Sequence, residues 1–304
     1  MKKQTALKSS AANTVSIVTK AALLSIIGNT VLSLFKLFAG IIANSQAMIS
    51  DAIHSASDIF SSIIVIIGAK IASKESDKTH PFGHERFECV AAIILSLMLF
   101  LAGLLIGYSA IQNTLSGNDN ISAPGLLALI AAIVSIVSKE AMYQYAAIHA
   151  RKIDSPALMA DAWHHRSDAF SSIGALVGII GARMGLSILD PISGIVICMF
   201  IIKAAYDIFK DAVNKMIDSS CNDTTEAQMT QIASGINGVL RIDSIKTRIF
   251  GNKIYVEIEI SADAKLSLEE SHTIAEKVHD AIEQGFDKVK HVTVHVNPYY
   301  TPNT

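Results

Sequence analysis

The sequence is poor in charged residues and in cysteine, and both shortages narrow what the protein can be. Charged residues make up only 17% of its 304 residues, against roughly 25% in ordinary soluble domains. The three cysteines, Cys89, Cys198 and Cys221, lie far apart and form no CxxC pair, so neither a disulfide framework nor a zinc ribbon is indicated. The formal net charge is −2, so the chain lacks the basic character of nucleic-acid-binding proteins.

Long apolar segments are what the sequence has instead. Hydrophobic residues account for 51% of the chain, and a helix needs about 20 residues to cross a bilayer. We therefore predict six membrane-spanning helices within residues 17–215, near 17–42, 46–72, 88–112, 124–148, 157–183 and 190–213. Residues 1–16 are basic, and the apolar stretch behind them is too long for a signal peptide, which indicates a retained cytoplasmic tail.

Lysine and arginine gather in one set of loops. They stand before the first span, between the second and third, between the fourth and fifth, and after the sixth, whereas the three opposite loops hold a single arginine. Because positively charged loops stay in the cytoplasm, both termini are predicted to be cytoplasmic.

Residues 216–304 have the composition of a soluble domain with short regular elements. We predict a helix over 224–236 capped by Asp223 or Thr224, and two strands over 244–251 and 253–261 joined at Gly251 and Asn252. An amphipathic helix over 266–285 and a strand over 288–298 follow. The order αββαβ suits a ferredoxin-like sandwich, with an irregular three-stranded domain as the alternative.

One pattern occurs twice in the apolar region. The segments SDAIHSASDIFSSI (50–63) and ADAWHHRSDAFSSI (160–173) are identical at nine of fourteen positions. Each places a histidine four residues before an aspartate, His54 with Asp58 and His164 with Asp168, and such residues share one helix face. Since the spans run in opposite directions, the two pairs can meet near mid-membrane. Two imidazoles and two carboxylates suit tetrahedral Zn²⁺ or a similar divalent metal.

Inserting an ionisable side chain into the middle of a membrane span costs roughly 3 kcal/mol of free energy. A role as a metal ligand is therefore favoured over a purely structural role for these residues. Asp51 and Asp161 precede the two histidines by three residues, where they can orient an imidazole or pass protons; a carboxylate facing water near the span end is the alternative. His165 and Arg166 are expected in helix packing or on the cytoplasmic side. Lys36 is assigned no function.

The paired segments HSASD and HHRSD, with DKTHPFGHERFE between the second and third spans, resemble the cation diffusion facilitator family of metal/proton antiporters. The resemblance covers essentially the whole chain. It implies a homodimer that exports divalent metal from the cytoplasm by alternating access in exchange for protons, with His54, Asp58, His164 and Asp168 as the transport site and a metallochaperone-like tail. No cofactor is implied beyond the metal. The two-His, two-Asp composition favours zinc, with cadmium or cobalt as secondary substrates, whereas carboxylates in place of the histidines favour iron or manganese.

Further sites follow from the same resemblance. Asp77, His80 and His84 stand at i, i+3 and i+7 around a Pro-Phe-Gly turn and match a second metal site, with a hydrogen-bonded turn as the alternative. In the tail, a binuclear site of altered composition is implied, comprising Asp243, Glu259, His272 and His295. Asn297 stands where an aspartate would bind, and His279 and His291 are interpreted as surface residues. Arg86 and Asp218 match a charge interlock between the halves of the dimer.

Two other function classes fit the sequence less well than a transporter does. A membrane metalloenzyme needs an open coordination position and a general base, but no HExxH motif occurs and a four-ligand shell leaves no place for water. A membrane-anchored metal sensor or scaffold would use the tail and keep the intramembrane site static. The chain has no His-rich cytoplasmic loop, as in prokaryotic members, which indicates a bacterial or archaeal plasma membrane.

Overall fold

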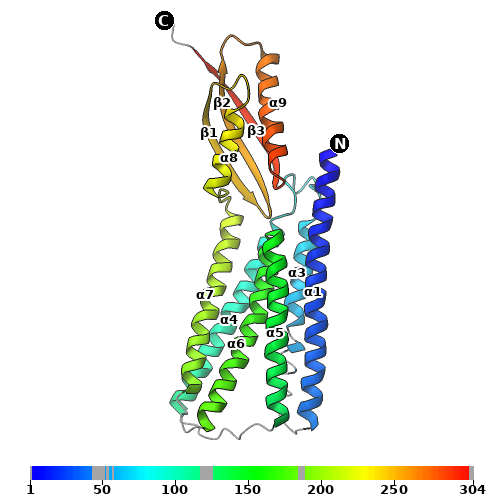
Figure 1. The fold of residues 1–304 in the computed structure, drawn as a ribbon, viewed down its shortest axis with the longest axis vertical. Helices are drawn as coiled ribbons and strands as arrows, with labels where there is room; N and C mark the ends of the chain where they lie inside the picture. Colours follow the sequence, from blue (N-terminus) through cyan, green and yellow to red (C-terminus); the bar gives the residue numbers. More distant parts are fainter. Residues whose placement is uncertain are drawn as a thin grey trace. The chain divides into compact units, whose positions relative to one another are not determined.

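The computed structural model describes residues 2–42, 52, 55–56, 58–116, 126–183 and 189–300. The chain divides into two compact units, Met1–Val213 and Asn214–Thr304. Figure 1 labels their helices and strands.

Helices form the described part of the first unit. They are α1 (Lys2–Ile42), α3 (Ile59–Ala72), α4 (Phe87–Ser116), α5 (Leu126–Ile153), α6 (Pro156–Arg183) and α7 (Leu189–Met216). Helix α5 packs against α6 and α1, while α3 contacts α1 and α4. Of the second predicted span, continuous helix is described only from Ile59, with Asp58 at the N-cap position.

The contact between α5 and α6 is made by small side chains. Ala146, Ala147 and Ala150 of α5 and Ala160 and Ala162 of α6 are all buried in one cluster. Small residues let two helix backbones approach closely inside a membrane. This close approach sets the distance between the polar side chains that the two helices carry further along.

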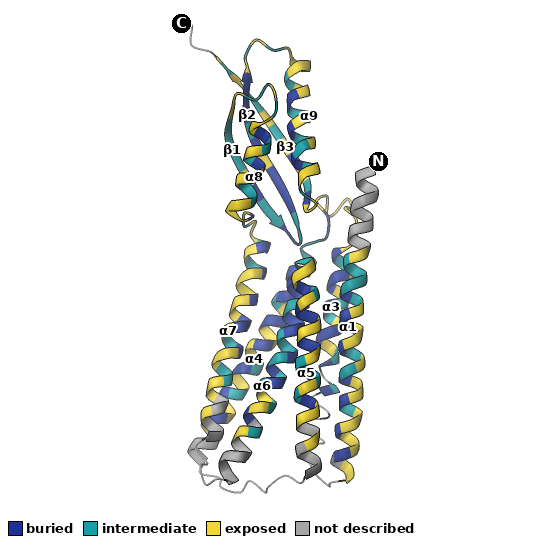
Figure 2. Ribbon diagram, in the orientation of Figure 1, coloured by how far each residue is buried: buried dark blue, intermediate teal, exposed yellow. Residues whose placement is uncertain are grey.

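Burial in the first unit is inverted relative to a soluble protein. Leu34 and Phe38 of α1 and Leu105 of α4 are 63%, 67% and 68% exposed, whereas Lys139 and Asp161 are buried. Figure 2 shows exposed residues along the outer faces of these helices. An apolar surface of this extent is rare on a soluble monomer and is typical of a lipid-facing one.

Among the described residues, two helices are long and apolar enough by themselves to cross a bilayer, Asn13–Ala39 within α1 and Phe87–Gln112 within α4; α3 is a shorter apolar helix. The predicted helical membrane region followed by a small α/β domain is therefore confirmed. The count of six spans stays a prediction.

The second unit follows the predicted order αββαβ. It contains α8 (Asp223–Ser234), β1 (Arg241–Phe250), β2 (Lys253–Asp263), α9 (Leu268–Gly285) and β3 (Val289–Tyr299). The sheet order is β1-β2-β3, with β1 and β2 antiparallel and β2 and β3 parallel. A parallel pair needs a crossover connection, which α9 supplies.

The turn between β1 and β2 lies where the sequence predicts it. Phe250 pairs with Lys253, which leaves two residues to reverse the chain, and Gly251 takes a φ of 64°. That left-handed conformation is open to glycine without steric cost. The register places Val256, Ile258 and Ile260 of β2 in the core of the unit.

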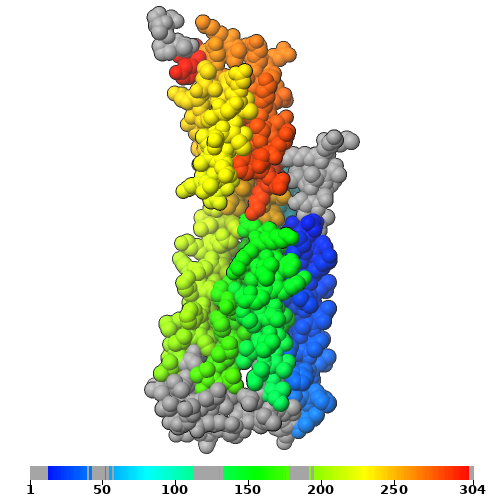
Figure 3. Space-filling model, in the orientation of Figure 1, coloured from blue at the N-terminus to red at the C-terminus, as the bar shows by residue number. Residues whose placement is uncertain are grey.

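The two helices of the second unit contact each other, and in Figure 3 their side chains form one continuous layer. Helix α8 starts one residue earlier than predicted. Its N-cap is Asn222, whose side chain accepts a hydrogen bond from the Thr225 amide at 2.8 Å, and not Asp223 or Thr224. Asn222 has the extended backbone that an N-cap requires, whereas Asp223 is already helical.

Candidate metal centre

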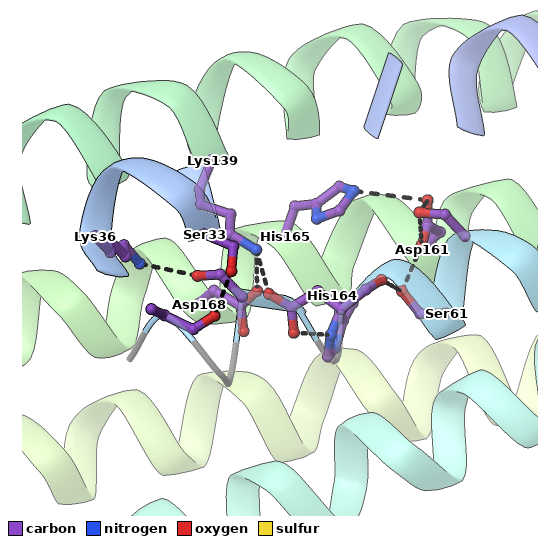
Figure 4. A network of polar contacts seen from close by, with 12 residues as sticks. Ser33, Lys36, Ser61, Lys139, Asp161, His164, His165 and Asp168 are labelled. Carbon is purple, nitrogen blue, oxygen red and sulfur yellow. Dashed lines mark hydrogen bonds and ion pairs between the residues drawn. The ribbon is translucent and has the colours of Figure 1, made fainter. Parts of the chain in front are cut away.

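Three of the four predicted metal ligands converge in the first unit. Asp58, His164 and Asp168 each offer a ligand atom, and these atoms lie within 4.8 Å of one another. His164 Nε2 lies 3.2 Å from Asp58 Oδ1. Figure 4 shows this network of polar contacts. The fourth predicted ligand, His54, lies outside the described residues.

The ligands reach the site from two helices. His164 and Asp168 stand one turn apart on α6, as their spacing predicts, and Asp58 precedes the first turn of α3. Asp58 is 3% exposed, so its carboxylate is removed from bulk solvent. Nitrogen and carboxylate oxygen together are the donors that Zn²⁺ and other borderline divalent metals accept.

A lysine from α5 joins the two carboxylates, and the sequence interpretation missed it. Lys139 Nζ lies 2.5 Å from Asp58 Oδ2 and 2.8 Å from Asp168 Oδ2. The lysine is only 2% exposed. The signal was present in the sequence, since a lysine inside a predicted span is a functional candidate by default.

A second buried lysine lines the same region. Lys36 of α1 is buried and donates to Ser55 Oγ at 3.0 Å. A cavity of about 50 Å³ lies between Lys36, Lys139 and the carboxylates of Asp58 and Asp168, and serine hydroxyls complete its lining. The neighbourhood of the candidate site is therefore polar and roomy enough for a side chain to shift.

The role predicted for Asp161 is only partly matched. Its carboxylate is fully buried, which rules out the water-facing alternative, but it accepts hydrogen bonds from Ser61 (2.9 Å) and Ser62 (3.2 Å) of α3. Its nearest imidazole is that of His165, at 3.6 Å, and not that of His164. His165 stands four residues after Asp161 on α6, a spacing that places the two side chains one turn apart on the same helix face. Asp51, its counterpart, lies outside the described residues.

Arg166 has the helix-packing role that was expected. Its guanidinium stacks over the Tyr143 ring at 4.3 Å and donates to the Tyr143 hydroxyl at 2.7 Å. It also approaches Glu140 at 3.8 Å. These contacts join α6 to α5 beside the site.

The loop between α3 and α4 brings the predicted triad together. Ligand atoms of Asp77, His80 and His84 lie within 4.8 Å of one another. His84 is buried; its Nδ1 is 3.1 Å from the Glu75 carbonyl and its Nε2 is 3.4 Å from Asp77 Oδ2. A carbonyl partner of this kind orients a histidine so that its other nitrogen can bind a metal.

Asp77 is held as an ionised carboxylate. Hydrogen bonds from the Thr79 hydroxyl (2.7 Å) and from the His80 backbone N–H (2.7 Å) lower the pKa of Asp77 from 3.8 to about 2. Both interpretations of the loop, a hydrogen-bonded turn and a metal site, are compatible with this geometry.

The four predicted tail ligands do not converge within one chain. The Asp243 carboxylate is already bound by Ser261 (2.7 Å), Asn297 (2.9 Å) and Arg241 (2.6 Å), and these hydrogen bonds, Ser261 first, lower its pKa to about 2. Glu259 and His295 are opposite each other in the β2–β3 register. His272 instead pairs with Glu276 along α9 at 3.4 Å. His272 lies on α9 with a side chain that is 69% exposed, whereas the other three residues lie on the strands.

A different cluster forms in the second unit, from residues interpreted as surface histidines. His279, Glu283 and His291 bring their ligand atoms within 4.8 Å of one another. His279 and Glu283 stand one turn apart on α9, and His291 comes from β3. No local spacing links His291 to α9, so sequence periodicity could not have found the cluster.

The predicted interlock residues belong to different units. Arg86 precedes α4 in the first unit, and Asp218 follows α7 in the second, where its backbone has a φ of 63°. Their pairing stays a prediction.

Comparison with known proteins adds two family matches. Residues 22–217 match the cation efflux transmembrane domain, and residues 221–299 match the cytoplasmic domain of cation efflux proteins. The uncharacterized transporter MJ0449 of Methanocaldococcus jannaschii is 36% identical over 280 residues, spanning 92% of this chain and 98% of that protein. The manganese efflux system protein MneP of Bacillus subtilis is 32% identical over 288 residues, spanning 92% and 96%. A cadmium form of the MamM CTD matches 26% of this chain at 20% identity, with a TM-score of 0.25.

Proposed function

Because the chain belongs to the cation diffusion facilitator family, whose members carry divalent metal cations across membranes, we propose that it exports Zn²⁺ from the cytoplasm in exchange for protons. It is a cation efflux transporter and not an enzyme. The observation that carries the proposal is the meeting of Asp58, His164 and Asp168 inside the helical unit. We assign His54 as the fourth ligand.

The choice of zinc rests on the donor set. Imidazole nitrogen is a borderline ligand that suits zinc, whereas sites built only from oxygen suit manganese and magnesium. The competing candidate is Mn²⁺, because MneP is a manganese efflux protein. Fe²⁺, Co²⁺ and Cd²⁺ are the remaining alternatives as main substrate.

Proton exchange is supported by competition for the same nitrogen atoms. A metal-bound imidazole must be neutral, so a proton and a metal ion exclude each other at His54 and His164. Imidazole also titrates near physiological pH. A more acidic outer face would therefore favour metal release there and loading from the cytoplasm.

The membrane arrangement is proposed from the charge pattern. Six helices within residues 17–215 cross the plasma membrane, and the positively charged loops place both termini in the cytoplasm. Residues 1–16 form a cytoplasmic tail. Residues 216–304 form a regulatory and dimerisation domain, so that the working unit is a homodimer that moves by alternating access.

The auxiliary sites are part of the same proposal. Asp77, His80 and His84 form a second metal site, supported by their convergence in the loop. The tail ligands Asp243, Glu259, His272 and His295 require a second copy of the chain to complete a site, since one chain does not assemble them. Arg86 and Asp218 interlock across the dimer, and Asp51 and Asp161 pass protons or hold neighbouring side chains.

The test is metal flux in sealed proteoliposomes that contain only this protein. Zinc uptake, slowed by competing Cd²⁺ or Co²⁺ more than by Fe²⁺ or Mn²⁺, is the expected result. An outside-acid difference of about one pH unit should accelerate zinc export and be accompanied by proton movement. Metal binding without any flux would replace the transporter by a membrane-anchored sensor, and a preference for Mn²⁺ would overturn the choice of zinc.

A further inference from the structure

Lys139 occupies the space that a metal bound by Asp58 and Asp168 would need. Its Nζ lies 2.5 Å and 2.8 Å from one oxygen of each carboxylate. Carboxylate oxygens bind Zn²⁺ at about 2.0–2.2 Å, so an ion held by the same two oxygens would fall on or beside the ammonium nitrogen. Two cations a few ångströms apart in a buried site repel strongly. The ammonium and the metal therefore exclude each other.

We propose that Lys139 is a tethered counter-cation, which neutralises the transport-site carboxylates when no metal is bound and moves aside when metal loads. This inference rests on the proposed transport function. Two buried carboxylates without a compensating charge are costly inside a membrane. Lys139 supplies that charge from α5, without any ion from solution.

The residues around Lys139 provide polar space for its displaced ammonium group and a positive charge that repels it from that space. The polar cavity of about 50 Å³ next to it is lined by hydroxyls that include Ser55 and Ser135, which can receive a displaced ammonium group. Lys36 also lines this cavity. Its like charge drives Lys139 back to the carboxylates once the metal has left.

If Lys139 has this role, its loss should affect net zinc export and zinc-for-zinc exchange differently. Net export requires the metal-free transporter, with protons on its site histidines, to turn back across the membrane, and that step needs the carboxylates neutralised by Lys139. Exchange of zinc for zinc releases and rebinds metal on the same side of the membrane, so the metal-free transporter never has to turn back and the lysine is not needed for that step. A residue that only positions the carboxylates would be needed for both.

The test replaces Lys139 with methionine, which keeps the length and removes the charge. In detergent, Lys139→Met should bind Zn²⁺ about tenfold more tightly than the wild type. In proteoliposomes it should retain exchange of labelled zinc while net export slows. Lys203→Met, which removes an exposed lysine of α7, is the matched control and should behave like the wild type.

Unchanged or weaker zinc binding in Lys139→Met would overturn the proposal, as would equal losses of exchange and net export. If the methionine variant does not assemble, Lys139→Arg keeps the charge and should bind zinc no more tightly than the wild type; tighter binding would overturn the proposal. Absence of zinc flux in the wild type would remove the proposed function, while the binding comparison in detergent would still decide the role of Lys139.

A second and independent inference concerns the seam between α9 and the β3 edge of the sheet. We infer that His279, Glu283 and His291 bind a divalent cation such as Zn²⁺ in the second unit. His279 Nε2 and His291 Nδ1 lie 3.2 Å and 3.6 Å from the same oxygen, Glu283 Oε1. The other nitrogen of His279, Nδ1, is 2.7 Å from the Val292 carbonyl.

That carbonyl contact decides which nitrogen is available. A carbonyl accepts only from N–H, so Nδ1 carries the proton and the Nε2 lone pair faces Glu283. A histidine oriented in this way is the usual arrangement around a bound metal. Glu283 is largely buried whereas His291 is 56% exposed, so an ion can enter from solvent and complete its shell with water.

The test counts zinc bound per full-length chain by equilibrium dialysis. Glu283→Gln and His291→Ala should each lose one bound ion relative to the wild type, and the visible absorption of bound Co²⁺ should fall in parallel. His149→Ala on α5 removes a histidine elsewhere and should leave the count unchanged. Retention of the full count by both variants would overturn the site, and melting in EDTA checks that each variant is folded.

Discussion

At the scale of single residues, the candidate site consists of buried groups of opposite charge in contact with one another. Asp58 faces His164 on one side and Lys139 on the other, and Asp168 shares the same lysine. Each of these groups would be costly alone inside a membrane. Together they form a network in which the positive charge of Lys139 faces the same carboxylate oxygens that the proposed metal ion would bind.

Asp58→Asn and Asp168→Asn are each expected to reduce zinc flux to the background of empty liposomes, because each removes an anionic ligand from a small set. The measurement is labelled-zinc uptake by purified, reconstituted variants. Asp207→Asn on α7 removes an exposed carboxylate paired with Lys203 and should transport normally. Normal flux in either site variant would contradict the assignment.

Substituting His164 by Asp is expected to move selectivity from Zn²⁺ toward Mn²⁺, on the order of tenfold in the ratio of the two uptakes, because a borderline nitrogen gives way to a hard oxygen. Competition uptake with both metals present measures the ratio. An unchanged ratio would place metal selection elsewhere.

At the scale of elements, function depends on where helices begin and on what holds their ends. Asp58, a proposed metal ligand, lies at the start of α3, and the His279–Glu283–His291 cluster depends on the position of α9 against β3. Helix α9 is fixed at its N-terminus by a capping box, in which Ser267 accepts from the Glu270 amide and Glu270 reaches back to the Ser267 amide. Its buried stripe of Ile274, Val278 and Ile282 then orients the histidine face.

Ser267→Ala should lower the free energy of unfolding of the second unit by about 1 kcal/mol, because it leaves an N-terminal amide of α9 without its partner. In a domain of this size the melting temperature should fall by about 4–8 °C. Thermal unfolding of a chain comprising residues 214–304 measures the change. Ser271→Ala, which removes a serine that bonds only within the helix, should change stability by less than about 0.5 kcal/mol.

At the scale of the whole molecule, two units of opposite character share one chain. The first exposes apolar side chains and buries charge, whereas the second has an apolar core of Met229, Val256, Ile258, Val278 and Ile282. Transport belongs to the first unit. The second matches the cytoplasmic domain of cation efflux proteins, and we propose that it pairs two chains and senses metal.

Residues 214–304 are expected to fold alone, because their core is complete within the unit, and to form a dimer that zinc tightens. Sedimentation with and without Zn²⁺, together with calorimetric titration, measures both effects. No zinc binding even at millimolar concentration would leave this unit a dimerisation module without a metal function.

Sequence by itself was enough for the features that depend on local composition and spacing. The apolar segments, the αββαβ order, the turn at Gly251 and the repeated histidine–aspartate pattern can all be read within a window of a few turns, because each is set by neighbouring residues. Three of the four ligands chosen from that pattern do converge, and so does the loop triad of Asp77, His80 and His84.

Only the tertiary structure decided which distant side chains share a site. Lys139 lies 81 residues from Asp58 in sequence. It meets Asp168 because α5 packs against α6, and it meets Asp58 because the start of α3 lies beside the same site. His291 meets His279 and Glu283 because a parallel crossover places β3 beside α9. Such contacts depend on helix packing and strand register across the whole fold, and a local sequence pattern cannot predict them.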